Sequence, residues 1–165
     1  MVAKFHLAQV NVARMKYSPD DARMKSFYAA LDKVNALADR TEGFVWRLQD
    51  DGGDATTFRF DGAGAEDLLI NMSVWENITA LRRYIYQSVH ARVMARREKW
   101  FAPMGAPNLA LWWVPAGTLP DLSDAQKALE QLERHGPTAQ AFNFHRLYDA
   151  AGKPVALPPI EALCA

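Results

Sequence analysis

The chain has 165 residues, of which 50% are apolar and 23% are charged, a balance typical of one globular domain. Its 19 basic and 19 acidic residues give a formal net charge of zero, which argues against a general nucleic-acid binder because such proteins carry a basic excess. No apolar run is long enough to span a bilayer, and the single cysteine, Cys164, and an N-terminus without a secretory signal lead us to expect a cytoplasmic protein.

The first part of the chain predicts a strand, a helix and a second strand. Phe5–Val12 alternates apolar and polar residues, as a strand does. Ser18–Asp21 is typical of a helix start, and apolar residues at helical spacing continue to Ala38. Gly43 stands where a helix stop is expected, and a strand at Phe44–Gln49 follows it.

The second part predicts further strands and helices in alternation. Asp50–Asp54 has the composition of a turn, and Thr56–Phe60 predicts a short strand or an extended arm. Leu68–Trp75 predicts a strand, and a helix capped by Ser73 or Asn77 is expected to run towards Phe101. The remaining predicted elements are a strand at Leu109–Val114, a helix at Ser123–Arg134 and a short strand at Ala141–Phe144.

The order strand, helix, strand, strand, helix, strand predicts an α+β fold. Two β-α-β units in series form a ferredoxin-like antiparallel sheet with helices on one face. We therefore expect a single ferredoxin-like domain over residues 1–165, in which residues 145–165 form a C-terminal surface tail.

Strand parity divides the predicted sheet into two faces, because successive side chains point to opposite sides. In all three of the first predicted core strands, the even positions are mainly apolar and are expected to pack on the helices. The odd positions include short hydrogen-bonding residues, which are unusual on an open sheet surface. We expect this face to line a small-molecule pocket or an interface between subunits, with a solvated surface as the third alternative. These positions, called the polar row below, are Gln9, Asn11, Arg47, Gln49, Asn71 and Ser73.

His90 is the candidate for proton transfer or for binding a haem iron. It follows Tyr86 by four residues, so a helix would place the two on one face. A packed or surface histidine is the alternative interpretation. The sequence contains no cluster with metal-ligand spacing and no nucleotide-binding or hydrolase motif, so we expect no metal site.

Several short segments together point to a known family. They are Asn35–Ala38, Gly43–Gln49, Asn71–Glu76, Tyr86–His90, Arg97–Phe101 and Leu111–Gly117. With them the chain resembles, over about residues 5–145, a family of uncharacterised bacterial proteins classed with the dimeric α/β-barrel proteins, which include the antibiotic-biosynthesis monooxygenases. The resemblance implies a homodimer in which two sheets enclose a barrel. Thr118 departs from the family, which commonly has a histidine at this place.

Three functions remain open at this point. The first is a cofactor-independent oxygenase for a small aromatic or polyketide-like substrate, in which Arg47 holds an anionic oxygen, Asn71 orients a carbonyl and His90 moves a proton. The second is haem binding or haem degradation through His90, and the third is a non-catalytic dimer that binds a metabolite. The expected substrate-binding residues are Gln9, Asn11, Gln49, Ser73, Trp75, Tyr86 and Trp112.

Overall fold

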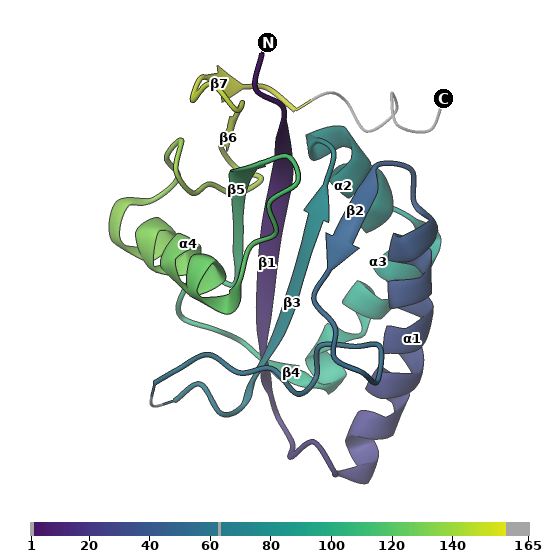
Figure 1. The fold of residues 1–165 in the computed structure, drawn as a ribbon. Coiled ribbons are helices and arrows are strands. Elements are labelled where there is room, and N and C mark those ends of the chain that lie inside the picture. Colours follow the sequence, from purple (N-terminus) through teal and green to yellow (C-terminus); the bar gives the residue numbers. More distant parts are fainter. Residues whose placement is uncertain (1, 63, 158–165) are drawn as a thin grey trace.

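In the computed structural model, which describes residues 2–62 and 64–157, a curled antiparallel sheet lies between two layers of helices (Figure 1). Cys164 lies outside the described residues. The main strands are β1 (Phe5–Met15), β2 (Phe44–Arg47), β3 (Leu68–Trp75), β4 (Phe101–Ala102) and β5 (Leu109–Pro115). The α-helices are α1 (Lys25–Arg40), α2 (Ile78–Ile85), α3 (Ser88–Ala95) and α4 (Leu122–His135).

β1 is the centre of the sheet. It pairs with β3 along one edge, and with β5 and then β4 along the other, while β2 pairs with β3 at the outside. All of these pairs are antiparallel. The β-α-β-β-α-β order of β1, α1, β2, β3, α2 and β5 with this pairing is the ferredoxin-like arrangement, so the predicted α+β fold class is confirmed.

The smaller elements lie at the ends of this framework. Two short 3₁₀ turns, at Ala22–Met24 and Arg97–Lys99, precede α1 and follow α3. The region expected to be a surface tail contains a two-stranded hairpin of β6 (Leu147–Tyr148) and β7 (Pro154–Val155). Phe142 forms an isolated bridge with Leu111 where a short strand was expected, and Thr56–Phe60 forms no strand.

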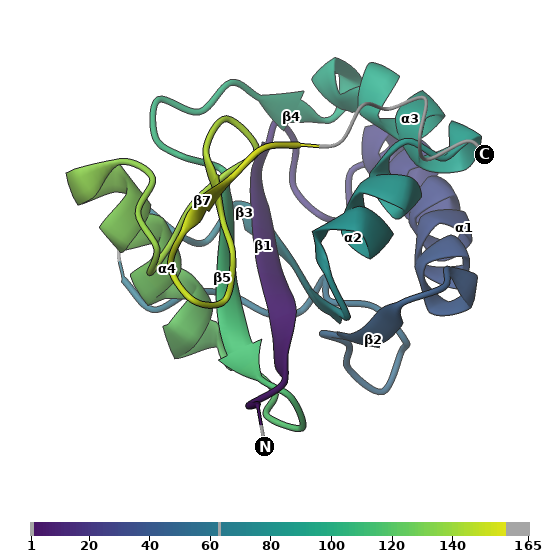
Figure 2. The same cartoon turned by 90° about the horizontal axis from the view of Figure 1, so that it is seen from above.

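The helices lie on both faces of the sheet, which corrects the expectation that they cover only one. α1, α2 and α3 lie on one side and α4 on the other, as the view from above shows (Figure 2). The even residues of the strands pack with α4 in a cluster called the α4 cluster, which contains Val10, Met72 and Trp112 together with Ala128. These apolar side chains therefore face α4 and not the helices that follow β1 and β3.

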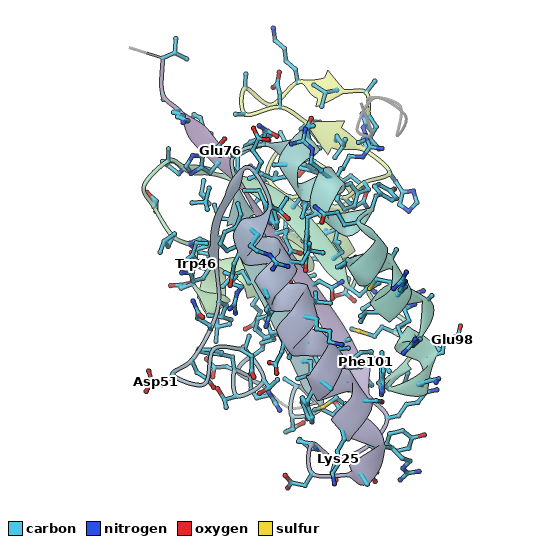
Figure 3. All side chains as sticks on the ribbon, turned by 90° about the vertical axis from the view of Figure 1, so that its right-hand side faces the viewer. Lys25, Trp46, Asp51, Glu76, Glu98 and Phe101 are labelled. Atoms are coloured by element: carbon cyan, nitrogen blue, oxygen red, sulfur yellow. The ribbon has the colours of Figure 1, made fainter. Side chains whose placement is uncertain are left out.

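The face that carries the polar row is covered by α1, α2 and α3, which reverses the predicted orientation. Two apolar clusters occupy the ends of this face. The α1–α2 cluster contains Leu7, Val34, Ala38, Trp75, Ala80, Leu81, Tyr84 and Leu111, among others. The Trp100 cluster contains Met15, Met24, Phe27, Leu69 and Trp100. Figure 3 shows α1 lying across this face of the sheet, from Lys25 towards the end at which Glu76 lies.

The long helix expected between Asn77 and Phe101 is broken into α2 and α3. α2 begins as expected, because the Asn77 side chain accepts a hydrogen bond from the Ala80 backbone N–H. It ends at Tyr86, and Gln87 has an extended backbone with φ −68° and ψ 146°. The Gln87 side chain donates to the Thr41 hydroxyl at 3.3 Å, which ties this break to the end of α1.

The sheet face opposite α1 is buried within one chain. Val10, Val12 and Met72 are at most 2% exposed, and Phe60 and Met104 from the connecting loops pack on the same cluster. The two-subunit barrel stays a prediction, and a second sheet would meet a face that this chain already covers.

Gly43 joins α1 to β2 at a point where no other residue fits. Its φ is +86°, and a Cβ built on it would lie 2.5 Å from the Ala80 Cβ in α2. We expect Gly43→Ala to cost about 1–2 kcal/mol for the backbone conformation and about 1–3 kcal/mol more for the overlap. Urea unfolding measures the sum.

Gly53→Ala is the matched control for this variant. Gly53 has φ +88° and no neighbouring atom within 4 Å of an added Cβ, so it reports the backbone cost alone. Equal destabilisation of the two variants would show that the close approach of Gly43 to α2 has no energetic weight.

Candidate functional site

A chain of side-chain hydrogen bonds connects β1 and β3 on the face covered by α1. The Gln9 Nε2 donates to Asn71 Oδ1 at 2.7 Å and to Ser73 Oγ at 2.9 Å. The Trp75 Nε1 donates to the same Ser73 Oγ at 2.8 Å. Gln9 and Ser73 are 6% and 5% exposed, so these bonds satisfy polar groups that water does not reach.

Asn71 differs from its partners because it is exposed, although it lies on a central strand under the helices. Solvent therefore reaches the sheet between the two apolar clusters of this face. The Asn71 Oδ1 accepts from Gln9, and the two N–H groups of its amide donate to no described residue. Asn11, its register partner on β1, is half-buried beside it.

A series of rings extends from the end of this chain. Trp75 stacks on Tyr84, with ring centroids 5.1 Å apart and an interplanar angle of 24°. The Tyr84 hydroxyl donates to the Val34 carbonyl oxygen at 3.4 Å, and burial raises the pKa of this phenol. The His90 ring centroid lies 4.9 Å from that of Tyr84, with an interplanar angle of 59°. The order Trp75, Tyr84, His90 separates the imidazole from Asn71 by two rings.

His90 has the surroundings of a neutral imidazole. Its Nδ1 lies 3.0 Å from the Ile85 carbonyl oxygen, and burial lowers its pKa below the ordinary value. An N–H on Nδ1 that donates to this carbonyl leaves Nε2 as the acceptor nitrogen.

Arg47 is engaged in contacts that hold the fold. Its Nε donates to Asp39 Oδ1 of α1 at 2.8 Å, and its Nη1 donates to the Gly53 carbonyl oxygen at 2.7 Å. The side chain is 11% exposed. The guanidinium thus ties β2 to α1 and to the following loop.

The remaining predicted site residues lie apart from Asn71. Trp112 pairs with Ala8 on β1 and faces the α4 cluster, on the opposite side of the sheet. Successive side chains of β5 point to opposite faces, so Trp112 does not lie on the same side of the sheet as Asn71, where the sequence had led us to expect it. Gln49 is exposed beyond the end of β2. Tyr86 is 53% exposed at the end of α2, where the Arg82 guanidinium lies 5.7 Å from its ring.

Two residues of this region were not predicted from the sequence. Tyr84 stacks on Trp75, and the only signal for it is its spacing of three residues from Leu81 on α2. Asn35 is 7% exposed on α1, and its side chain makes no hydrogen bond with the described residues. It lies one turn before Asp39, the partner of Arg47. A polar residue inside an otherwise apolar helix face is the signal that could have found it.

The described part of the chain gathers no three His, Cys, Asp or Glu side chains that could hold a metal ion. Among its helices, none combines the length and the apolar character needed to cross a membrane.

Comparison with known proteins gives a family and a set of similar folds. Residues 6–156 match the family described as a domain of unknown function (DUF3291). No curated protein matches the chain.

Three solved structures illustrate the similar folds. SnoaB, a cofactor-independent oxygenase from Streptomyces nogalater, is 18% identical over 70% of this chain and 98% of its own, with a TM-score of 0.46. NE2512, a protein of unknown function from Nitrosomonas europaea, is 14% identical over 72% and 98%, with a TM-score of 0.47. A protein named 'putative antibiotic biosynthesis monooxygenase', from the same organism, is 11% identical over 72% of this chain and 94% of its own, with a TM-score of 0.44.

The lowered pKa of His90 predicts a pH dependence of stability. An unfolded histidine binds a proton below about pH 6.5, whereas the buried imidazole resists protonation until a lower pH. The unfolded state then binds more protons, so the contribution of His90 to stability is complete above pH 6.5 and decreases as the pH falls through this window. Urea unfolding between about pH 7.5 and pH 5 measures the free energy of unfolding of wild type and of His90→Gln, and the difference between them is followed as the pH falls.

We expect wild type to lose more stability than His90→Gln over that range. The other histidines are common to both proteins and cancel in the comparison. Parallel curves for the two proteins would mean that His90 titrates alike in the folded and unfolded states.

Proposed function

The chain belongs to the DUF3291 family, and we propose that it is an enzyme that acts on a small aromatic or polyketide-like substrate bound between the sheet and α1. The observation that carries the proposal is Asn71, an exposed amide whose orientation is fixed by buried Gln9 on a face that helices otherwise cover. A solvated surface residue needs no such support.

The amide of Asn71 is suited to stabilise negative charge on a substrate oxygen. Its N–H donors are held in place before any ligand arrives, and such preorganised donors stabilise an oxyanion or enolate as it forms. Removal of one comparable donor in other enzymes costs about 10²–10³ in rate. We propose that Asn71 donates to the carbonyl or enolate oxygen of the substrate.

The neighbours of Asn71 favour a flat apolar substrate body. Leu69 and Trp75 precede and follow the polar positions on the same face of β3, and each belongs to an apolar cluster. The polar side chains of Gln9 and Ser73, which are hydrogen-bonded to each other, lie between these apolar residues. Apolar walls with a few fixed polar groups are the usual composition of a small-molecule site.

Arg47 and His90 take different parts in this proposal from those that the sequence suggested. The Arg47 guanidinium is bonded to Asp39 and Gly53, so it supports β2 beside the site. His90 is a neutral base, and the rings of Tyr84 and Trp75 separate it from Asn71. We propose that it accepts a substrate proton only if the substrate reaches past Tyr84, and that Asn71 carries the main effect.

The resulting reaction class is a cofactor-independent oxygenation. A phenol or 1,3-diketone loses its acidic proton to solvent and forms an enolate, and the enolate carbon gives two electrons to O2 to form a hydroperoxide after protonation. Loss of water from the hydroperoxide leaves a new ketone or quinone oxygen on that carbon. Stabilisation of the enolate is the task that Asn71 can perform. The proposal is tested by measuring oxygen uptake by the protein with a panel of hydroxylated polycyclic phenols and 1,3-diketones, in buffer treated to remove metals.

For a substrate found in this way, we expect Asn71→Leu to lower kcat by about 10²–10³ because the amide donors are lost while the side-chain shape is nearly kept. Steady-state oxygen-electrode kinetics measure kcat and KM for each variant.

Asn108→Ala is the matched control, since Asn108 is an exposed asparagine in the loop before β5. It should leave kcat within about twofold of wild type, the size expected for a surface change. A folded Asn71→Leu protein that turns over at the wild-type rate would remove Asn71 from the reaction.

Haem binding through His90 remains the second candidate, because an Nδ1–H that donates to a carbonyl is also the arrangement of many metal-ligating histidines. His90 lines neither the groove between α1 and α3 nor the hollow beside Trp112 and α4. Its ring packs against Tyr84, and its Nδ1 lies 3.0 Å from the Ile85 carbonyl oxygen. These contacts favour a packed histidine over a haem ligand.

Titration of the purified protein with haemin tests this point. We expect no saturable Soret shift, and the His90→Ala protein should give the same trace as wild type. A stoichiometric shift that disappears in His90→Ala would establish haem ligation and replace the oxygenase proposal.

The proposed enzyme is also expected to form a homodimer. In the third hypothesis, a dimer without catalysis, no substrate is turned over beside Asn71. Sedimentation of wild type at micromolar concentration gives the oligomeric state. The oxygen-uptake screen then distinguishes a catalytic dimer from a dimer without catalysis.

A further inference from the structure

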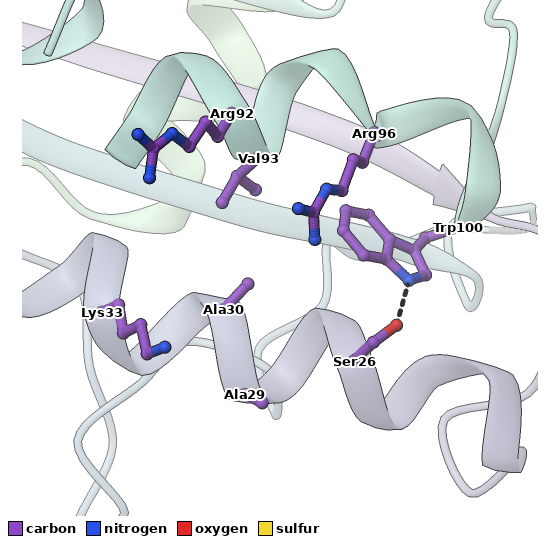
Figure 4. A pocket seen from close by; sticks show the side chains of 8 residues that line it. All are labelled: Ser26, Ala29, Ala30, Lys33, Arg92, Val93, Arg96 and Trp100. Carbon is purple, nitrogen blue, oxygen red and sulfur yellow. Dashed lines mark hydrogen bonds between the residues drawn. The ribbon is translucent and has the colours of Figure 1, made fainter. Parts of the chain in front are cut away.

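A groove with an apolar floor lies between α1 and α3, on the outer side of the helix layer (Figure 4). Its volume is about 430 Å³. Ala29 and Ala30 of α1 and Val93 of α3 line it, and the buried indole of Trp100 closes one end. The Trp100 Nε1 donates to the Ser26 hydroxyl at 3.0 Å, which fixes the ring at this end of the groove.

Three cations surround this floor. Arg92 of α3 and Arg96, which follows the helix directly, extend towards α1, and Lys33 lies on α1 opposite them, as Figure 4 shows. None of the three has an ion pair or a side-chain hydrogen bond among the described residues. No acidic residue lines the groove. The excess positive charge here is therefore not neutralised by the lining.

This arrangement differs from an ordinary solvated helix face. Arg92 and Arg96 are four residues apart and repel each other on the helix, and Lys33 adds a third like charge from a second helix. An oxyanion bound among the three would replace this repulsion by attraction. The Ser26 hydroxyl accepts from Trp100 and keeps its own proton as a further donor.

We propose that the groove binds a small organic anion with a flat apolar body, whose carboxylate or phosphate lies among Lys33, Arg92 and Arg96. Guanidinium groups bind both oxyanions in a bidentate manner. The apolar body lies on Ala30 and Val93 and against the Trp100 indole. The volume is within the range of about 300–1,000 Å³ of small-molecule sites, and it suits a body of two or three fused rings.

This site does not depend on the proposed reaction at Asn71. The two can be tested separately, because the groove is defined by binding and the reaction by turnover.

The experiment is a titration followed by the ¹H–¹⁵N signal of the Trp100 indole. The probes are 2-naphthoate, 2-naphthyl phosphate and the neutral 2-naphthamide. We expect a saturable shift with at least one of the two anions, and binding of 2-naphthamide at least about tenfold weaker because it lacks the charge. The tighter of the two anions identifies the oxyanion that the groove prefers.

Variants locate the binding. Arg92→Gln combined with Arg96→Gln should weaken the anion by about tenfold or more through loss of both guanidinium groups. Ala29→Phe should weaken it by filling the floor. Arg97→Gln is the matched control, an exposed arginine next to Arg96 that does not line the groove, and it should leave the affinity unchanged.

Three results would overturn the proposal. They are the absence of a saturable shift up to about 10 mM of either anion, equal affinity for the acid and the amide, and equal affinity of the double variant and Arg97→Gln. Because Arg92 and Arg96 are exposed, the double variant should fold, and its unperturbed indole signals would confirm this.

Discussion

The buried amide of Gln9 is the constraint on which the polar arrangement of the sheet depends. It lies on the central strand, and each of its N–H groups would cost about 1–3 kcal/mol if left without an acceptor. Asn71 and Ser73 of β3 provide the two acceptors. This bond occupies the Asn71 oxygen, so the amide N–H groups are the part of Asn71 that remains to bind a ligand. The register of β1 with β3 thus sets the chemistry at the surface, because a slip by one residue would move Asn71 to the other face.

The sequence predicts much of this arrangement, since strand parity is a strict rule. The expected strand at Leu68–Trp75 is the observed β3, and Gln9, Asn71 and Ser73 share a face as predicted. Parity does not determine which face the helices cover. Both faces carry enough apolar side chains to pack on a helix, because Leu69 and Trp75 lie at the ends of the polar stretch. The helices of the β-α-β units cover that face, and α4 covers the more uniformly apolar one.

The break between α2 and α3 could not be predicted, because the contact found at it is a tertiary one. No glycine or proline marks Tyr86 and Gln87, and the apolar spacing continues through them. The Gln87 side chain instead bonds to Thr41, a residue far away in sequence. This break changes the direction of the chain, so the expected helical pairing of Tyr86 with His90 is lost. Tyr86 faces solvent, while His90 packs on Tyr84.

The charge on the groove is a local feature of a chain whose net charge is zero. No acidic residue lines the groove, and charges more than about 8 Å away are largely screened at physiological ionic strength. Trp100 connects this groove to the sheet: its indole closes the groove on one side and packs in the cluster of Leu69 on the other. Leu69 precedes Asn71 by two residues on the same face of β3. An anion held between α1 and α3 would therefore contact Trp100, which packs in the same cluster as Leu69, the apolar neighbour of Asn71 on β3.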